Sequence, residues 1–529
     1  MSHMVNSPAS LEDHTFRDPP HVVTRFRVTV GLLAGLRWRD ITSAREFMLL
    51  RYGQHPWPVR IIKLILWSLY VMWCEIPDSL PWVTLDINVS RTPYWLTVKN
   101  PLENYPWVND PQGRLPETAA VVVVGAGFGG AAVAYHWSKC GSEPLVLLER
   151  NEAASGSAGR NGGIVVMAGG TCHGYYVYQP VLRYLTERQP EMSSEERDIR
   201  ASDFADIYVK AVQASHEMIA RTIETESIDC DYARKGWMFF TDPHSQPNLE
   251  ASFAFASRMD HCDWVRHHPE QVRERSGVNT PLDGAESRGS ATWHPAKWVW
   301  GVLSVALRSS NVELFTRTNV QSVQRDDSFY LVHTDRGTIR TRHVVNATES
   351  HTPTVFKEFL SPFPDLITPY REQGMHAEGG PPSMTPQIGV SGPLGWFSRV
   401  ASGGIVFGSD HTPVKDHQAG RNEPSRFITR FESAAIGKHW NPVPLHVTHE
   451  WTGTTSTTPD KYPVVGLLDG HGLYMLGGFA GAGSAVSFNA GQTIVNLVLG
   501  RPCEPNYHPE QYFSPFRFTD PSRYGKRPA

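Results

Sequence analysis

The chain has 529 residues, enough for roughly three or four domains, and its 16 tryptophans can help to fill a large apolar core. Its formal net charge of -4 argues against a nucleic-acid-binding protein, because such proteins usually carry a clustered basic surface. The six cysteines are scattered without a CxxC pair, which is typical of reduced thiols and indicates neither a disulfide framework nor a metal site. Residues 5–30 lack the apolar core of a secretory signal, so we expect a cytoplasmic protein.

Residues 1–115 differ in composition from the rest of the chain, and we predict that they form an N-terminal extension. They are rich in Trp, Pro and Arg and contain one strongly apolar helix. Its uninterrupted apolar run, Leu64–Cys74, is too short to span a bilayer, which needs about 20 residues. Three placements of this helix stay open: burial against the body of the protein, contact with a second subunit, or peripheral contact with a membrane surface. Prolines between Pro81 and Pro116 then predict an extended connector.

The first pattern with a chemical meaning is a strand, a glycine turn and a helix. The continuously apolar run AAVVVV, residues 119–124, is typical of a buried parallel strand, and a helix is predicted over 131–139. Between them lie Gly125, Gly127, Phe128, Gly129 and Gly130. In such a unit the first glycine allows the tight turn, the second admits a pyrophosphate, and the third lets helix and strand pack closely. The helix N-terminus then offers N–H groups to the phosphates.

The next predicted strand, Glu143–Arg150, carries an acidic residue near its end. Glu149 stands 24 positions after Gly125, close to the spacing of roughly 20 residues expected for a carboxylate that binds ribose hydroxyls. A carboxylate there repels a 2′-phosphate, which disfavours NADP. The pattern therefore predicts a site for FAD or NAD.

Further strand-like and helical segments alternate along the rest of the chain. A long helix is predicted over about 204–226, and short strands recur at 236–240 and in NVQSVQ, HVVNA, GGIVFGS and GLYMLGG. This mixture predicts an α/β fold whose parallel sheet is assembled from segments far apart in the sequence.

After Glu149 the chain reads RNEAASGSAGRNGGIVV. This string resembles the FAD-dependent amine and amino-acid oxidoreductases of the D-amino-acid oxidase superfamily, which includes glycine oxidase, sarcosine oxidase and the γ-glutamylputrescine oxidoreductases. The stretches FTRTNVQSVQ, HVVNATESHTP, EWTGTTSTTPDKYPVVG and GLYMLGGFAGAGSAVSFNAGQ carry the same resemblance, which covers most of residues 117–518.

The resemblance implies FAD as the cofactor, with its phosphates at the first glycine turn and its ring beside a second turn near the C-terminus. Besides the first glycine turn, the residues implied to bind FAD are Glu149, Arg150, Ser157, Arg160, Asn161, Gly162, Gly163, Ile164, Val320, Ala347, Gly478, Phe479, Gly481, Gly483 and Ser484. Relatives that attach the flavin covalently use a cysteine or a histidine at two positions that correspond here to Gly453 and about Arg160. We therefore predict non-covalent FAD and no metal.

The resemblance also implies an FAD-binding Rossmann-like domain interleaved with an α+β substrate domain built on a mixed sheet, after the N-terminal helical extension. We predict the extension at 1–115, the FAD-binding domain at 116–170, 288–350 and 445–518, and the substrate-binding domain at 171–287 and 351–444.

The implied reaction is oxidation of a C–N bond of an amine or amino-acid-like small molecule, with oxygen or another electron acceptor. The arginine and lysine that hold a substrate carboxylate in sarcosine oxidase are absent: Ile164–Met167 and Ala485 occupy those places. Arg371 or Arg399 could supply such a clamp from another direction. The candidate catalytic residues are Tyr370, His376, Glu450 and Thr454, to which TCHGYYVY adds His173 and Tyr176.

Two other functions stay open. A flavin monooxygenase or halogenase shares the first strand–turn–helix unit, although the GD and WxWxIP motifs of those enzymes are not visible. Alternatively, the flavoprotein serves mainly in assembly, with the N-terminal extension as its partner-binding surface, in a homo-oligomer or otherwise.

Overall fold

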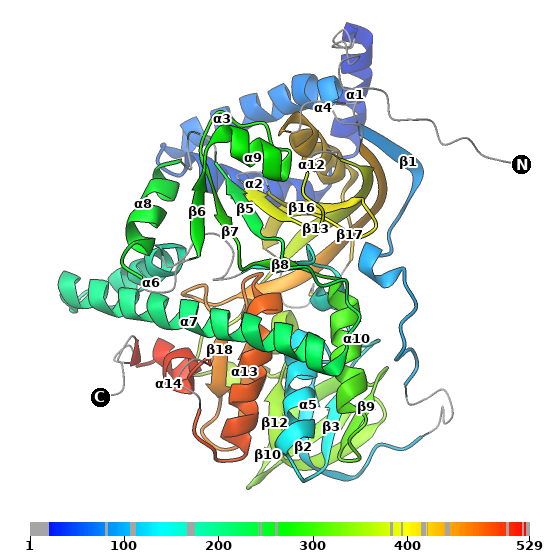
Figure 1. The fold of residues 1–529 in the computed structure, drawn as a ribbon, viewed down its shortest axis with the longest axis vertical. Helices are drawn as coiled ribbons and strands as arrows, with labels where there is room; N and C mark the ends of the chain where they lie inside the picture. Colours follow the sequence, from blue (N-terminus) through cyan, green and yellow to red (C-terminus); the bar gives the residue numbers. More distant parts are fainter. Residues whose placement is uncertain are drawn as a thin grey trace, which may run out of the picture.

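The computed structural model has two lobes with a long helix, α7, crossing between them (Figure 1). It describes residues 21–79, 83–105, 113–166, 175–241, 243, 246–259, 263–380, 384–392, 395–413, 419–420, 422–439, 445–503, 507–520, 523 and 524.

The lower lobe in Figure 1 is built on an eight-stranded sheet whose central strands are parallel. Its order is β10-β11-β12-β2-β3-β9, with β19 beside β12 and β18 beside β19. The strands are β2 (Thr118–Val124), β3 (Leu145–Leu148), β9 (Val312–Phe315), β10 (Val320–Asp326), β11 (Phe329–Thr334), β12 (Gly337–Asn346), β18 (Val464–Leu467) and β19 (Leu473–Gly477). Strands far apart in sequence meet here in parallel, since β2 lies between β12 and β3, and β19 pairs with β12.

Both faces of this sheet are covered, which explains the unbroken apolar run of β2. Val121 and Val123 join the apolar cluster beneath the helices, whereas Val122 and Val124 join a second cluster on the other face. All four side chains are buried. A strand buried on both faces has no need for polar alternation, so the predicted parallel α/β arrangement is confirmed.

The upper lobe contains a mixed nine-stranded sheet of order β1-β17-β13-β16-β15-β14-β5-β7-β6. Its strands are β1 (Val83–Ser90), β5 (Trp237–Phe240), β6 (Trp264–His267), β7 (Gly284–Ser287), β13 (Thr368–Gly379), β14 (Gly389–Gly392), β15 (Gly395–Arg399), β16 (Ile405–Pro413) and β17 (Leu445–Thr457). A short pair, β4 (Ile164–Val165) and β8 (Ala291–Thr292), forms a separate two-stranded sheet.

The helices divide between the lobes (Figure 1). They are α1 (Val22–Ala34), α2 (Trp38–Tyr52), α3 (Trp57–Tyr70), α4 (Ile76–Ser79), α5 (Phe128–Cys140), α6 (Tyr175–Arg188), α7 (Ser194–Glu226), α8 (Gln246–Ala256), α9 (Pro269–Ser276), α10 (Pro295–Ala306), α11 (Thr352–Val355), α12 (Arg426–His439), α13 (Gly483–Val498) and α14 (Glu510–Phe513). In the lower lobe α5 packs against α10 and α13, so the helices of both glycine turns lie side by side.

The predicted start of the last FAD-domain segment, at residue 445, differs from the sheet arrangement. β17 pairs with β13 along its whole length, and both belong to the nine-stranded sheet. Residues 445–457 therefore continue the sheet of the upper lobe, and the chain enters the lower sheet only at β18. The sequence alone gave no sign of this, because EWTGTTST is equally suited to either sheet.

The N-terminal extension is attached to the upper lobe by a strand and by one apolar cluster. β1 adds a parallel edge strand to β17. Leu32, Val71, Met72 and Ile76 pack with Ala434 of α12. By contrast, none of the residues of α3 is buried. Burial against the body, the first of the three placements, is therefore confirmed for the last part of the predicted apolar helix, residues 71–76, and is wrong for residues 57–70. Among the described residues, no helix has the length and apolarity needed to cross a membrane.

Candidate functional site

One cavity of about 1190 Å³ reaches from the lower lobe into the upper lobe and touches both glycine turns. Of the predicted FAD-binding residues, those that line it are Gly125, Gly127, Phe128, Gly129, Glu149, Arg150, Ser157, Arg160, Asn161, Gly162, Ile164, Val320, Ala347, Phe479, Gly481, Gly483 and Ser484. Gly130, Gly163 and Gly478 are not among the lining residues, and they act instead through the backbone they shape.

The first glycine turn requires glycine for steric reasons at two positions. Gly125 has φ +105°, and a Cβ there would lie 2.6 Å from the Ala347 carbonyl oxygen. A Cβ on Gly130 would lie 1.8 Å from the Gly125 carbonyl oxygen, so this residue lets α5 approach the strand. At Gly127, however, a Cβ would meet only the Ala158 Cβ, at 3.8 Å. This second glycine therefore faces open space in the cavity.

The N-terminus of α5 is available to an anion. Gly127 is the N-cap and provides no side-chain hydrogen bond, and the first turn carries no acidic residue. Its first N–H groups and the helix dipole therefore favour a phosphate at the cavity wall.

Glu149 stands at the end of β3, next to this turn. Its two carboxylate oxygens accept the backbone N–H groups of Ala126 and Asn151, both at 2.9 Å. Burial raises the pKa of Glu149 above its ordinary value, and the two N–H donors oppose this shift. The carboxylate is thus fixed in orientation, as a ribose-binding acceptor needs to be.

The loop after β3 is held rigidly by side chains from four other segments. The carbonyl oxygens of Arg160 and Asn161 accept hydrogen bonds from the indoles of Trp451 and Trp95, at 2.9 and 2.6 Å. Those of Gly162 and Ile164 accept from Ser398 and Ser484, at 2.6 and 2.8 Å. Because Trp95 belongs to the N-terminal extension, that extension takes part in fixing the loop.

The second glycine turn leads into α13. Gly478 and Gly481 have φ +67° and +86°, and a Cβ on Gly481 would meet nothing within 4 Å. α13 begins at Gly483, and its N-cap residue, Ala482, has no side-chain cap. Two helices, α5 and α13, therefore present uncapped N-termini to the same cavity.

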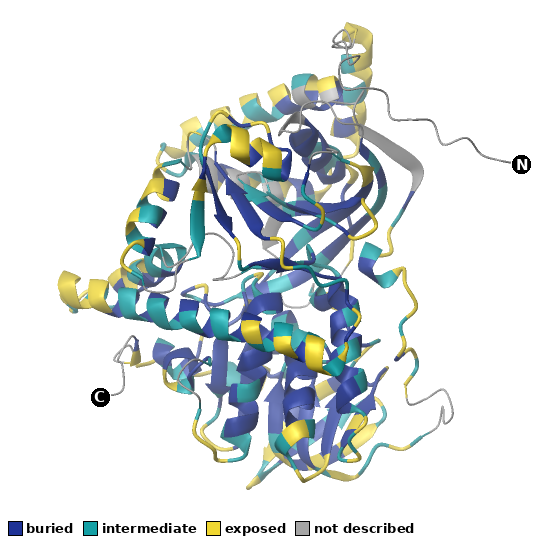
Figure 2. Cartoon of the chain, in the orientation of Figure 1, coloured by how far each residue is buried: buried dark blue, intermediate teal, exposed yellow. Residues whose placement is uncertain are grey.

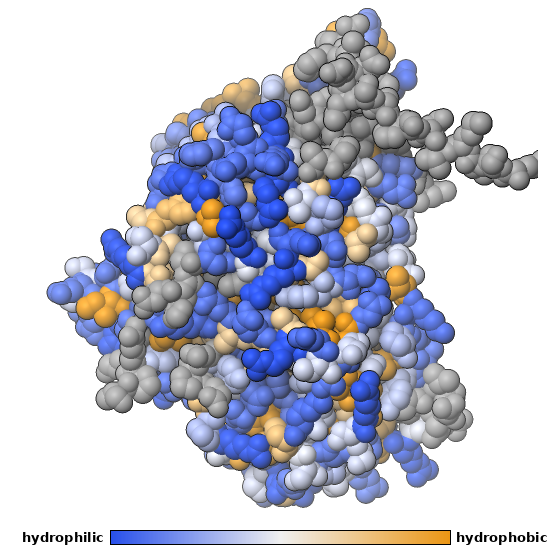
Figure 3. Space-filling model, in the orientation of Figure 1, coloured by the Kyte–Doolittle hydropathy of each residue, from blue (hydrophilic) through white to orange (hydrophobic). Residues whose placement is uncertain are grey.

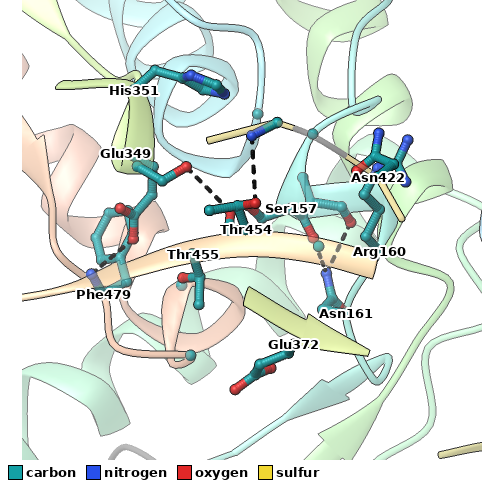
Figure 4. Close-up of a pocket in the computed structure, with 18 of the residues that line it drawn as sticks. Ser157, Arg160, Asn161, Glu349, His351, Glu372, Asn422, Thr454, Thr455 and Phe479 are labelled. Carbon is teal, nitrogen blue, oxygen red and sulfur yellow. Dashed lines mark hydrogen bonds between the residues drawn. The ribbon is translucent and has the colours of Figure 1, made fainter. Parts of the chain in front are cut away.

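Glu349 is a lining residue that the sequence analysis missed. It has φ +52°, which is rare for a side chain other than glycine. Its carboxylate accepts the Phe479 N–H at 3.0 Å and the Ser456 hydroxyl, and Figure 4 shows it directed toward Phe479. Burial raises its pKa above the ordinary value. Strained residues gather at functional sites, but no sequence motif marks a single strained glutamate.

The four predicted catalytic residues divide into one inside the cavity and three outside. Thr454 lines it, and its carbonyl oxygen accepts the Ser157 hydroxyl at 2.6 Å (Figure 4). Tyr370, His376 and Glu450 do not line it. β13 pairs with β17 in regular register from Thr368 to His376, so the even spacing puts Tyr370 and His376 on one face of the strand, yet neither side chain reaches the cavity.

The residues outside the cavity have structural partners. The His376 ring stacks on Tyr94, with centroids 4.0 Å apart, and burial lowers its pKa to about 3. Burial holds the pKa of Tyr370 well above 10. Glu450 accepts the Thr429 hydroxyl at 2.7 Å and forms an ion pair with Arg426 at 3.2 Å. Tyr176 lies in α6, whereas His173 lies outside the described residues.

The cavity also has a wall that no family motif predicted. The N-terminal extension contributes Asp40, Ala44, Trp67 and Ser68, and α12 contributes Phe427, Ile428, Phe431 and Glu432. The Trp67 and Phe431 rings meet edge-on, 5.5 Å apart. An extension added before the dinucleotide unit thus helps to enclose the site.

A protein-family model described as FAD dependent oxidoreductase matches residues 120–497. The chain belongs to this family. It is therefore an FAD-dependent oxidoreductase, an enzyme with a small-molecule substrate and an electron acceptor, and the resemblance drawn from its motifs is confirmed.

Individual relatives are distant. The probable oxidoreductase OrdL of Haemophilus influenzae is 21% identical over 394 residues, which are 73% of this chain and 84% of that protein. L-Proline dehydrogenase from P. horikoshii superposes with a TM-score of 0.62 at 18% identity, covering 77% of this chain and 99% of its own. Glycine oxidase from Geobacillus kaustophilus superposes with a TM-score of 0.58 at 17% identity, covering 73% of this chain and 96% of its own. These structural similarities establish the fold.

The residues present fit FAD. Two uncapped helix N-termini, open space at Gly127 and Gly481, and a fixed carboxylate on β3 all face one elongated cavity. The family model ends at residue 497 and begins at 120, so the wall formed by Asp40 and Trp67 is outside the part that relatives share.

Proposed function

We propose that this oxidoreductase oxidises a C–N bond of an amine. When bound, FAD would serve as the acceptor of a hydride from the carbon next to the amine nitrogen. Loss of this hydride converts the amine to an imine, which water hydrolyses to a carbonyl compound and ammonia. The observation that carries the proposal is the single cavity that joins both glycine turns to a chamber in the upper lobe.

The protein contributes binding, orientation and exclusion of water. The N-termini of α5 and α13 stabilise negative charge, on phosphate at one end and on the reduced ring at the other. Trp396 packs against the flavin loop, since a Cβ on Gly162 would lie 2.7 Å from its ring. Apolar walls favour the neutral amine, whose lone pair is needed for hydride loss. Because Glu450 is ion-paired away from the cavity, we assign it no catalytic role.

We further propose that FAD is bound without a covalent link. Gly453 and Arg160, the two positions at which relatives carry the attaching residue, both line the cavity, and neither side chain can form such a bond. Acid precipitation should therefore leave a colourless protein pellet and a yellow supernatant. A yellow pellet would contradict this.

An anaerobic screen of amines tests the reaction. We expect loss of flavin absorbance with a subset of amines and formation of the matching carbonyl compound. Flavin bleaching by NADPH without any amine would instead indicate a monooxygenase. Failure of every amine would favour a role in assembly. Hydrogen peroxide released per amine consumed then separates an oxidase from a dehydrogenase.

The exposed side of the N-terminal extension is unusually apolar. Of the 20 exposed large apolar side chains in the described residues, 17 lie between Val22 and Trp73. Figure 3 shows part of this surface at the upper rim. The same helices expose four cations, Arg27, Arg37, Arg45 and Lys63, and among the described side chains of residues 21–70 no carboxylate is exposed.

We propose that α1–α3 lie on an anionic membrane surface. A second copy of the chain would bring these cations together, whereas anionic headgroups complement them and the acyl region accepts the apolar side chains. Of the two remaining placements for the exposed part of the apolar helix, contact with a second subunit and contact with a membrane, we thus propose the membrane.

Sedimentation with vesicles tests this contact. The wild-type enzyme should bind vesicles containing phosphatidylserine, and I62E/L66E should lose most of that binding. Ile199 on α7 is equally exposed, at 54% against 57% for Ile62, so I199E is the matched control and should bind normally. A wild-type dimer in solution that I62E/L66E dissociates, without vesicle binding, would overturn the proposal.

A further inference from the structure

The chamber formed by the N-terminal extension and α12 has a chemistry that indicates its ligand. This inference rests on the proposed function and specifies its substrate. Three carboxylates line the cavity in the upper lobe: Asp40 of α2, Glu372 of β13 and Glu432 of α12. Four aromatic rings line it as well, those of Trp67, Trp396, Phe427 and Phe431.

Positive charge in the cavity comes from the segment that follows β3 and not from α2, β13 or α12. Among the described lining residues, the only Lys or Arg side chains are Arg150 and Arg160. Arg150 follows the ribose-binding strand and lies 3.3 Å from the His351 ring. Arg160 donates to the carbonyl oxygens of Ser155 and Thr452. Arg371 and Arg399, the alternative carboxylate clamps, do not line the cavity. A substrate carboxylate would therefore meet negative charge in the chamber.

Asp40 is the group whose bonding is incomplete. Its side chain is buried, with 4% exposed, and Oδ2 accepts the Arg37 N–H at 2.7 Å. Oδ1 has no hydrogen-bond partner in the described part of the chain. A buried carboxylate oxygen without a partner is costly. An ammonium group from a ligand would supply the missing donor.

We infer that the substrate is an amine with a second, remote ammonium group and no carboxylate, and that Asp40 anchors that ammonium group. Two nitrogens are needed because their requirements differ. The nitrogen that is oxidised must be neutral, whereas Asp40 and the aromatic rings stabilise a cation. The ligand class is thus an alkyl or arylalkyl diamine.

Three probes of similar length test the inference: 1,5-diaminopentane, pentylamine and 6-aminohexanoate. Their affinities are measured by isothermal titration with the dithionite-reduced holoenzyme, which cannot oxidise them. We expect the diamine to bind roughly tenfold more tightly than pentylamine, the effect of one charged hydrogen bond, and 6-aminohexanoate to bind most weakly.

The variant Asp40→Asn keeps an acceptor for the Arg37 N–H but removes the charge. It should weaken diamine binding about tenfold and leave pentylamine binding unchanged. The control Asp326→Asn changes a half-exposed aspartate of β10, paired with Arg340 at 3.5 Å, and should change the binding of neither probe. Flavin content and melting temperature verify that each variant folds.

Two outcomes would overturn the inference: equal weakening of diamine and pentylamine by Asp40→Asn, or wild-type binding of 6-aminohexanoate as tight as that of the diamine. The wild-type probes alone decide the second outcome if the variant fails to fold. Failure of the proposed function is distinguishable, because diamine binding that depends on Asp40 without flavin reduction by any amine would retain the chamber and reject the reaction.

Discussion

The lower lobe buries its apolar side chains, whereas the helices of the N-terminal extension expose many of theirs. In the lower lobe, valines and leucines fill both faces of a sheet and are buried, whereas α1 and α3 direct Val, Ile, Leu and Trp side chains outward (Figure 2). The lobe shared with the family completes its own core. In the described part of α1–α4, one small cluster packs against α12, which indicates that the remaining apolar surface of these helices serves a contact outside the chain.

Removal of an ion pair should give the largest difference in unfolding free energy between the lower lobe and the extension. Arg517 and Asp460 are fully buried in the lower lobe and bonded at 2.8 Å, with the Tyr524 hydroxyl also donating to Asp460. Replacing Arg517 by Leu leaves a buried charge without its partner, so we expect a loss of about 3–5 kcal/mol in unfolding free energy.

The matched change in the extension is Arg25→Leu, which removes the partner of the half-exposed Asp78. Its cost should be about 1 kcal/mol or less. Urea denaturation of both variants measures the two values. Equal losses would show that the extension is as tightly integrated as the lobe.

Glycine substitutions should give the next largest difference. Gly130→Ala places a Cβ 1.8 Å from a backbone oxygen, so we expect a cost of about 3 kcal/mol and release of FAD. Gly31 lies within α1 with nothing within 4 Å of its Cβ position. Gly31→Ala should instead gain up to about 1 kcal/mol. Melting temperature and the flavin absorbance of the purified proteins measure both effects, and retention of FAD by Gly130→Ala would refute the first.

Acid sensitivity should be smaller and located in the lower lobe. His136 is buried with Nε2 2.9 Å from the Phe488 carbonyl oxygen, and burial lowers its pKa from 6.5 to about 4. The unfolded chain therefore takes up the proton first as pH falls. Stability from this group is present above pH 6.5 and is lost as pH falls from 6.5 toward 4.

The variant His136→Gln isolates this contribution. Between pH 7 and 5 the wild-type protein should lose up to about 2 kcal/mol more stability than the variant. His216 and His508 are shifted in the same direction, so some acid sensitivity should persist. Urea denaturation midpoints at pH 7 and pH 5 measure the loss of stability in each protein. An equal loss in the wild-type protein and the variant would contradict the assignment to His136.

The sequence predicted the parts of the site that depend on backbone. The run Ala119–Val124, the glycines at 125–130 and the turn before α13 have local steric requirements, so their pattern reveals their place. Prediction from the sequence failed where side chains from distant elements meet. Nothing in the sequence distinguished Thr454, which lines the cavity, from Glu450, four residues earlier, which pairs with Arg426. Glu349 escaped notice because its strain arises from the surrounding fold.

The sequence by itself determined a dinucleotide site with two glycine turns, because a phosphate-binding turn is a local device of a few residues, and the resemblance of its motifs to one family specified FAD. Only the tertiary structure decided that Asp40 and Trp67, far upstream, help to enclose the same cavity. It also decided that α3 remains exposed. The apolar pattern of a segment indicates that its side chains avoid water, but the surface that covers them is decided by packing between residues far apart in the sequence.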